Sequence, residues 1–215
     1  VGGAWVNTGT IPSKTLRESA LYMAGGRRRG ILHERAAEPT VRSFMALKRH
    51  LVARWGNKIE TNFESHGIHR ARGSAQFIDD HTLELEDGTR LSGKYIMIAT
   101  GSRPRAVEHL PIDGVRVHDS ETILQLEEIP LSMVVLGGGV IACEYASIFQ
   151  SLGVQVTLLN GRERLLGFVD AEATDFLENA LIDAGMVIKH NVRVESMDQT
   201  GQSEVTLTLD NGTIA

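Results

Sequence analysis

The pattern of apolar and polar residues is clearest in residues 132–160, where continuous apolar runs flank a segment with helical spacing of its apolar residues. The whole stretch reads SMVVLGGGVIACEYASIFQSLGVQVTLLN. The order is a short apolar strand over Met133–Leu136, a glycine turn, a helix that ends near Gly153, and a second apolar strand that ends at Asn160. This order predicts one unit of strand, helix and strand. The rest of the chain is interpreted around it.

Three further helices are predicted. The longest covers Val41–His66 and stops at Gly67, another covers Asp170–Ala184, and the third follows an irregular N-terminal loop and runs from Pro12 to about Met23. One apolar stripe of the longest helix is interpreted as a core-facing surface, with no cofactor role for its tryptophan. The stripe consists of Phe44, Met45, Leu51, Val52, Trp55, Ile59 and Phe63.

The remaining apolar and alternating segments predict strands, so the fold class is α/β. In the first half they lie within residues 69–79, within residues 82–91 with a hairpin turn at Asp87-Gly88, and at Tyr95–Ala99. Pro104–Gly114 is interpreted as a linker. The C-terminal strands are expected at Met186–Lys189, Val192–Met197 and Val205–Leu209, with a further hairpin turn at Asp210-Asn211-Gly212.

A glycine pattern lies directly between the first predicted strand and its helix, in the G-x-G-x-x-G/A spacing. The first glycine permits a tight turn, the second lets a dinucleotide pyrophosphate approach bare backbone, and the small third residue permits close helix packing. Unpaired N–H groups at the helix start attract the anion. A tight turn without a ligand is the alternative, and the flanking strands favour a nucleotide. The candidate residues are Gly137, Gly138, Gly139, Val140, Ile141 and Ala142.

The end of the second strand bears on which dinucleotide is bound. An NAD site has Asp or Glu about 20 residues beyond the glycines, where the carboxylate accepts hydrogen bonds from ribose hydroxyls. Here the position is Asn160, followed by Arg162 and Arg164. A carboxylate would repel a 2′-phosphate, whereas arginines bind one. The site is predicted to accept NADP(H) without excluding NAD(H), and solvated arginines remain an equal alternative.

Composition limits the other classes of function. The chain has 215 residues, a formal charge of −5 and a pI near 5.9, which gives no support for nucleic-acid binding, and Arg27-Arg28-Arg29 is interpreted as a solvated loop. The sequence contains no apolar run of membrane-spanning length and no signal-peptide pattern. The single cysteine, Cys143, excludes an internal disulfide, and cytoplasmic surroundings are predicted. No metal site is predicted.

The N-terminal segment GGAWVNTGTIPSK carries a family signal. It resembles the GGxCxNxGCxPSK segment of the flavin-dependent pyridine nucleotide–disulfide oxidoreductases. In that family the two cysteines form a redox disulfide, but Trp5 and Thr10 stand at these positions, so disulfide chemistry is not expected here. The pattern NTGTIPSKTLRE most resembles the branch of soluble pyridine nucleotide transhydrogenases. Trp5 is a bulky departure close to where the flavin ring would lie.

Lys14 is a candidate for a specific partner, because the helix dipole disfavours a cation at a helix start. A solvated lysine is the commoner outcome of this pattern. The resemblance implies that Lys14 pairs with Glu144 beside the flavin and the nicotinamide, where hydride moves. The other site residues that it implies are Ala75, Thr100, Gly101 and Ser102 for FAD, and Val194 for NAD(P).

The resemblance also implies a three-layer Rossmann-type fold. A partial FAD-binding domain is expected at residues 1–118 and a truncated NAD(P)-binding domain at residues 119–215. The chain is expected to be a central piece of a parent protein that is a homodimer or a larger homo-oligomer. The first FAD-binding glycine turn and the dimerisation domain are expected to lie outside it.

These observations predict hydride transfer between NADPH and NAD through FAD, with no redox disulfide. Because the flavin site is expected to be incomplete, the isolated chain is expected to be inactive and to purify without flavin. Two alternatives remain. One is another FAD-dependent NAD(P)H reductase, such as one like dihydrolipoamide dehydrogenase, and the other is a non-catalytic NAD(P)-binding piece.

Overall fold

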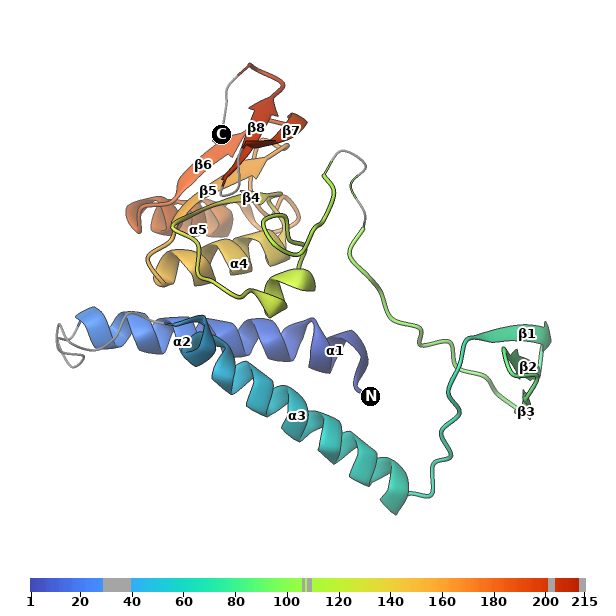
Figure 1. The fold of residues 1–215 in the computed structure, drawn as a ribbon. Helices are drawn as coiled ribbons and strands as arrows, with labels where there is room; N and C mark the ends of the chain where they lie inside the picture. Colours follow the sequence, from blue (N-terminus) through green and yellow to red (C-terminus); the bar gives the residue numbers. More distant parts are fainter. Residues whose placement is uncertain (29–39, 106, 108–109, 201–203, 213–215) are drawn as a thin grey trace.

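The computed structural model has mixed α/β structure and describes residues 1–28, 40–105, 107, 110–200 and 204–212 (Figure 1). Among these residues, every helix is too short or too polar to cross a lipid bilayer. The helices are α1 (Gly3–Asn7), α2 (Thr10–Arg28), α3 (Val41–Ser65), the 3-10 helix η1 (Thr122–Gln125), α4 (Val140–Ser151) and α5 (Ala171–Asp183). The strands are β1 (Ala75–Asp79), β2 (Thr82–Leu85), β3 (Arg90–Ser92), β4 (Ser132–Leu136), β5 (Gln155–Asn160), β6 (Val187–His190), β7 (Val194–Thr200) and β8 (Glu204–Leu209).

A parallel sheet of three strands, in the order β4, β5, β6, forms the centre of the C-terminal half. Its register pairs Met133 with Val156 and Leu158 with Ile188. Helix α4 connects the first two strands, and α5 connects the second and third. The predicted unit of strand, helix and strand is confirmed, because its apolar strands and amphipathic helix are strong local signals.

The two faces of this sheet are covered by different elements. Leu158 packs into the main core with α4, whereas its neighbour Leu159 packs with residues of β8 in a second cluster. Successive strand residues point to opposite faces, so the β7–β8 hairpin covers the face away from α4. The turn predicted at residues 210–212 follows β8, with Gly212 N donating to Leu209 O at 2.9 Å. Any strand after this turn lies outside the described residues.

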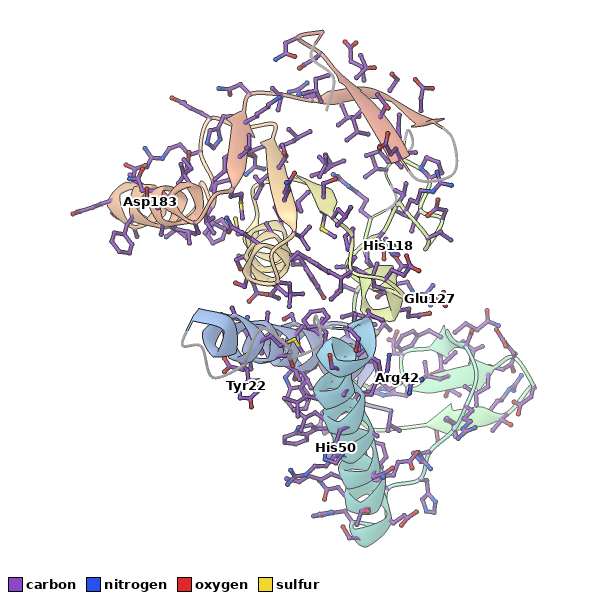
Figure 2. The ribbon with its side chains drawn as sticks, turned by 60° about the vertical axis from the view of Figure 1, so that its left-hand side comes forward. Tyr22, Arg42, His50, His118, Glu127 and Asp183 are labelled. Atoms are coloured by element: carbon purple, nitrogen blue, oxygen red, sulfur yellow. The ribbon has the colours of Figure 1, made fainter. Side chains whose placement is uncertain are left out.

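Helix α4 lies between the sheet and α2 (Figures 1 and 2), so sheet, α4 and α2 form successive layers. Phe149 of α4 and Phe44 of α3 meet edge to face, with ring centroids 6.1 Å apart. Both rings are fully buried in the main core together with Leu16 of α2. The Lys48 Nζ of α3 donates to Leu124 O of η1 at 2.6 Å, and burial lowers the pKa of this amine. These contacts join the N-terminal helices to the sheet domain.

Helix α3 agrees with the sequence prediction, and the N-terminal region does not. Thr40 caps α3 through a bond from Ser43 N, and Gly67 follows the helix with a φ of 62° that favours glycine. The expected N-terminal loop contains α1 instead. Helix α2 is longer than predicted and includes Arg27 and Arg28, so the expected loop is wrong for these two residues, and Arg29 lies outside the described residues. Packing of α2 against α3 and α4 outweighs the low helix propensity of its glycines.

Strands β1, β2 and β3 form a separate antiparallel sheet that stands apart from the other elements in Figure 1. The hairpin turn at Asp87-Gly88 is confirmed, with a φ of 80° at Gly88. The strand expected at Tyr95–Ala99 is wrong: these residues form coil, and Tyr95 and Met97 are 85% and 90% exposed. The described residues place no strand beside them, and a strand needs a neighbour to pair its backbone groups.

Candidate functional site

The glycine turn between β4 and α4 places its three glycines in different surroundings. Gly137 has a φ of 112°, which favours glycine, and its N–H donates to Leu159 O at 2.8 Å. A Cβ on Gly138 would lie 2.6 Å from the Asn160 side chain, so a larger residue does not fit there. A Cβ on Gly139 would meet no atom within 4 Å. Open space beside bare backbone is what a pyrophosphate requires at this position.

The first turn of α4 has no capping side chain. Its N-cap is Gly139, which has no side chain to accept a hydrogen bond. The starts of α5 and α3, by contrast, are capped by the side chains of Asp170 and Thr40. Val140 and Ile141 are exposed at this turn of α4. The dipole and the backbone N–H groups of α4 are therefore open to an anion.

Asn160, at the end of β5, is only 2% exposed, and its amide makes its hydrogen bonds within the protein. Its Oδ1 accepts from Arg162 N at 3.2 Å, and its Nδ2 donates to Arg164 O at 3.0 Å. The same Nδ2 lies 3.0 Å from His190 Nδ1. The amide is used to close the loop that follows β5, which is defined here as loop 160–164. A direct contact from Asn160 to a nucleotide stays a prediction.

The two arginines of loop 160–164 have different surroundings. Arg164 Nη2 donates to Ala171 O at 2.7 Å and to Thr174 Oγ1 at 3.1 Å, and it forms an ion pair with Asp175. These contacts tie the loop to the start of α5. The Arg162 side chain is exposed, and its guanidinium has no hydrogen bond or ion pair within the described part of the chain. Arg162 is therefore better placed than Arg164 to meet a 2′-phosphate.

Lys14 of α2 and Glu144 of α4 form an ion pair across the contact between the two helices. The pairing joins residues that lie 130 positions apart in the sequence. The Lys14 side chain is 57% exposed, and exposed pairs of this kind contribute at most about 1 kcal/mol to stability. The placement of the two charges near the start of α4 is therefore the more informative feature. Their role beside a flavin stays a prediction.

The two positions where the resembling family has cysteines hold no sulfur. Trp5 lies on α1 and meets Trp55 of α3 edge to face, with ring centroids 5.3 Å apart. The Lys58 Nζ lies 4.8 Å from the Trp55 ring. Thr10 is the first residue of α2. The only cysteine is buried Cys143, and burial raises the pKa of its thiol, which disfavours a reactive thiolate.

The residues assigned to FAD by resemblance do not come together. Ala75 is exposed at the start of β1, in the separate sheet. Thr100, Gly101 and Ser102 are exposed in the coil between β3 and β4 (Figure 1), and no hydrogen bond or ion pair in the described structure joins them to Lys14. The residues present therefore do not fit a complete flavin site. Val194 packs against the second core cluster, and its contact with NAD(P) stays a prediction.

Sequence reasoning missed His190, which lies beside Asn160, and Glu178, which lies beside His190. His190 Nε2 lies 2.7 Å from Glu178 Oε1, and both side chains are mostly buried. A histidine that ends a strand gives no recognisable sequence motif, so only its neighbours show its role. Within the described ranges, no three His, Cys, Asp or Glu side chains gather in a group that could hold a metal ion.

Comparison with known proteins gives consistent results for sequence and structure. The profile of the family "Pyridine nucleotide-disulphide oxidoreductase" matches residues 1–215. A soluble pyridine nucleotide transhydrogenase of Mycobacterium tuberculosis is 37% identical over 99% of this chain, and one of Colwellia psychrerythraea is 36% identical over 93% of it. The alignments cover 47% and 44% of these relatives, so the chain spans about half their length.

Solved structures of the same class share the fold over the whole chain. LpdA from Mycobacterium tuberculosis superposes with a TM-score of 0.87 at 26% identity, and the match covers 48% of that chain. The flavoprotein disulfide reductase RclA from Escherichia coli superposes with a TM-score of 0.83 at 28% identity, and the match covers 46% of that chain. The glycine turn, the fold and these similarities agree, and the chain belongs to the pyridine nucleotide–disulphide oxidoreductase family of flavin-dependent enzymes.

Proposed function

We propose that this chain is the nicotinamide-nucleotide-binding part of a flavin-dependent transhydrogenase, which transfers hydride between NADPH and NAD. The observation that carries the proposal is the open space at Gly139 in front of an uncapped helix. The similarity to named transhydrogenases supports the choice of reaction. Disulfide reduction requires a thiolate nucleophile, and Trp5 and Thr10 exclude one at the two family positions.

In this proposal, the first turn of α4 binds the pyrophosphate through backbone N–H groups at residues 139–142. Arg162 binds the 2′-phosphate of NADPH, and Arg164 holds loop 160–164 against α5. Lys14 and Glu144 tie α2 to α4 beside this site. When FAD is bound in the whole protein, it supplies the hydride carrier between the two nucleotides. No step of that transfer is assigned to the residues described here, because the FAD residues do not come together.

A second candidate is a nucleotide-binding chain without catalysis of its own, which the separation of Ala75 and Thr100 from Lys14 favours. It uses the same nucleotide site and differs only in the absence of bound flavin. We also place the boundary between an FAD-binding part and an NAD(P)-binding part at residues 118 and 119, and we propose that the whole protein is a homo-oligomer.

Titration of the 215-residue chain with NADPH and NADH, followed by nucleotide fluorescence, tests the site. Gly139→Ala adds a methyl group where no protein atom lies within 4 Å, so the protein should fold while the methyl group displaces the pyrophosphate. Losing charge-assisted hydrogen bonds worth about 1.5–3 kcal/mol should weaken both nucleotides about ten- to a hundred-fold.

Gly56→Ala is the matched control, because it adds the same methyl group in open space on α3 and should leave affinity unchanged. Equal affinity of the Gly139→Ala and unmodified proteins would exclude binding at this turn. Absence of nucleotide binding by the unmodified chain would contradict the proposed function itself.

A further inference from the structure

Three side chains form a polar relay behind the proposed nucleotide site. Asn160 ends β5 and His190 ends β6, and the two residues are paired in the parallel register. His190 lies between Asn160 and Glu178 of α5. Its Nδ1 is 3.0 Å from Asn160 Nδ2, and its Nε2 is 2.7 Å from Glu178 Oε1. The His190 and Glu178 side chains are only 21% and 24% exposed. The relay therefore connects α5 to loop 160–164 through the interior.

The hydrogen bonds of Asn160 determine which nitrogen of His190 carries the proton. Arg162 N donates to the Asn160 oxygen, and the Asn160 nitrogen donates to Arg164 O, which fixes the orientation of the amide. The same nitrogen faces His190 Nδ1, so this ring nitrogen must accept. The proton of the neutral imidazole is then on Nε2, which donates to Glu178.

The geometry points to His190 and Glu178 as positioning residues that hold loop 160–164 in its nucleotide-binding shape through Asn160, with the hold released when His190 becomes protonated. This inference rests on the proposed function for its effect on nucleotide affinity. It assigns no contact between His190 and the nucleotide. The loop it concerns carries Arg162, the exposed candidate for the 2′-phosphate.

Protonation of His190 places an N–H group on Nδ1. This group then faces the N–H donor of Asn160, so the hydrogen bond between the two side chains is lost. Rotating the amide would satisfy His190, but it would set the Asn160 oxygen against Arg164 O and the Asn160 nitrogen against Arg162 N. The amide also lies against the glycine turn, in the space that a Cβ of Gly138 would need. The expected response is a rearrangement of loop 160–164.

Other charged groups around the relay bear on its proton. Glu178 Oε1 lies 2.7 Å from His190 Nε2, and Asn160 Nδ2 lies 3.0 Å from His190 Nδ1. Burial is the main cause of the raised pKa of the Cys143 thiol on α4, and the nearby charge of Glu178 is a further cause. The charged groups adjoining the relay are Glu178 and Asp175 on α5, Arg162 and Arg164 on loop 160–164, and Lys189 before His190 on β6.

The first measurement needs no nucleotide. The ¹⁵N–¹H signal of the Arg162 backbone amide, which donates to Asn160, is followed between about pH 8 and about pH 5.5, the range over which imidazoles exchange protons. His190→Asn puts an amide oxygen near the position of Nδ1 and does not titrate in this range. His50→Asn on α3 removes an exposed histidine that takes no part in the relay, as the control.

The Arg162 signal should move with pH in the unmodified protein and in His50→Asn, and it should stay constant in His190→Asn. The second measurement is the affinity for NADPH as the pH is lowered. When nine-tenths of His190 is protonated, only about one-tenth of the unmodified protein keeps the binding shape of the loop. Its apparent affinity should therefore fall about ten-fold further than that of His190→Asn. Comparison of the two proteins cancels the titration of the nucleotide itself.

An Arg162 signal that moves equally with and without His190, or that never moves, would overturn the inference. If no nucleotide binds at any pH, the proposed function fails, and the Arg162 signal alone decides the positioning role. If His190→Asn does not fold, Glu178→Gln replaces it. Loss of the carboxylate removes one end of the relay, so the pH dependence of the Arg162 signal should change, and an unchanged pH dependence would overturn the inference.

Discussion

At the scale of single residues, the uncharged amide at position 160 has a physical reason. A carboxylate there could accept from Arg162 N, but it could not donate to Arg164 O or to His190 Nδ1. Asn160 supplies both a donor and an acceptor, and Gly138 leaves it the necessary space. The residue at the end of β5 therefore shapes the following loop from within, and we expect nucleotide selection to depend on side chains on the outer surface of this loop.

Arg162→Glu tests that selection directly. Removing a charge-assisted contact and adding repulsion should weaken NADPH relative to NADH by about 1.5–3 kcal/mol, or about ten- to a hundred-fold. Both nucleotides are titrated against both proteins. Arg54→Glu, an equal charge reversal at an exposed position of α3, should leave the ratio unchanged. A constant ratio in Arg162→Glu would show that this arginine does not meet the 2′-phosphate.

At the scale of elements, the first turn of helix α4 and the later part of the same helix have different roles. Its first turn is exposed at Val140 and Ile141 and carries no cap, whereas Ile148 and Phe149 further along are fully buried between the sheet and α2. The buried part holds the open end in place. Helix α1 is held differently: Val6 is fully buried, and Trp5 meets Trp55 of α3.

The tryptophan pair predicts a measurable coupling between α1 and α3. Trp5→Ala and Trp55→Ala should each lower the free energy of unfolding, and the double variant should lose about 1 kcal/mol less than the sum, because the edge-to-face contact is lost only once. Denaturant unfolding of the four proteins measures this. Trp5→Phe keeps an aromatic edge and should retain most of the coupling, whereas strict additivity would show that the rings do not stabilise each other.

At the scale of the whole molecule, the two kinds of cofactor residue are organised differently. The glycine turn, loop 160–164 and the pair Lys14–Glu144 all adjoin the sheet and α4. The separate β1–β3 sheet and the exposed coil hold the residues assigned to FAD (Figure 1). The described residues thus hold the parts of the proposed nucleotide site without an assembled flavin site, and the chain spans about half the length of its curated relatives.

The isolated chain is therefore expected to purify without bound flavin and still to bind NADPH. Absorbance in the flavin bands after gel filtration measures the first property, and nucleotide titration measures the second. Added FAD should elute separately from the protein, because Ala75 and Thr100 do not converge with Lys14. Stoichiometric flavin retained through the column would show that these residues form a site after all.

The sequence by itself determined the βαβ unit, the glycine turn, the long helix α3 and the hairpin at Asp87-Gly88, because periodicity, capping and turn chemistry act within a few residues. The tertiary structure decided what depended on distant partners. The strand predicted at Tyr95–Ala99 is absent, because no described strand lies beside these residues. The Asn160 side chain points inward and contacts His190. Resemblance to a family predicted the pairing of Lys14 with Glu144, but only the packing of α2 on α4 brings the two charges together, since no local pattern reports a contact across 130 residues.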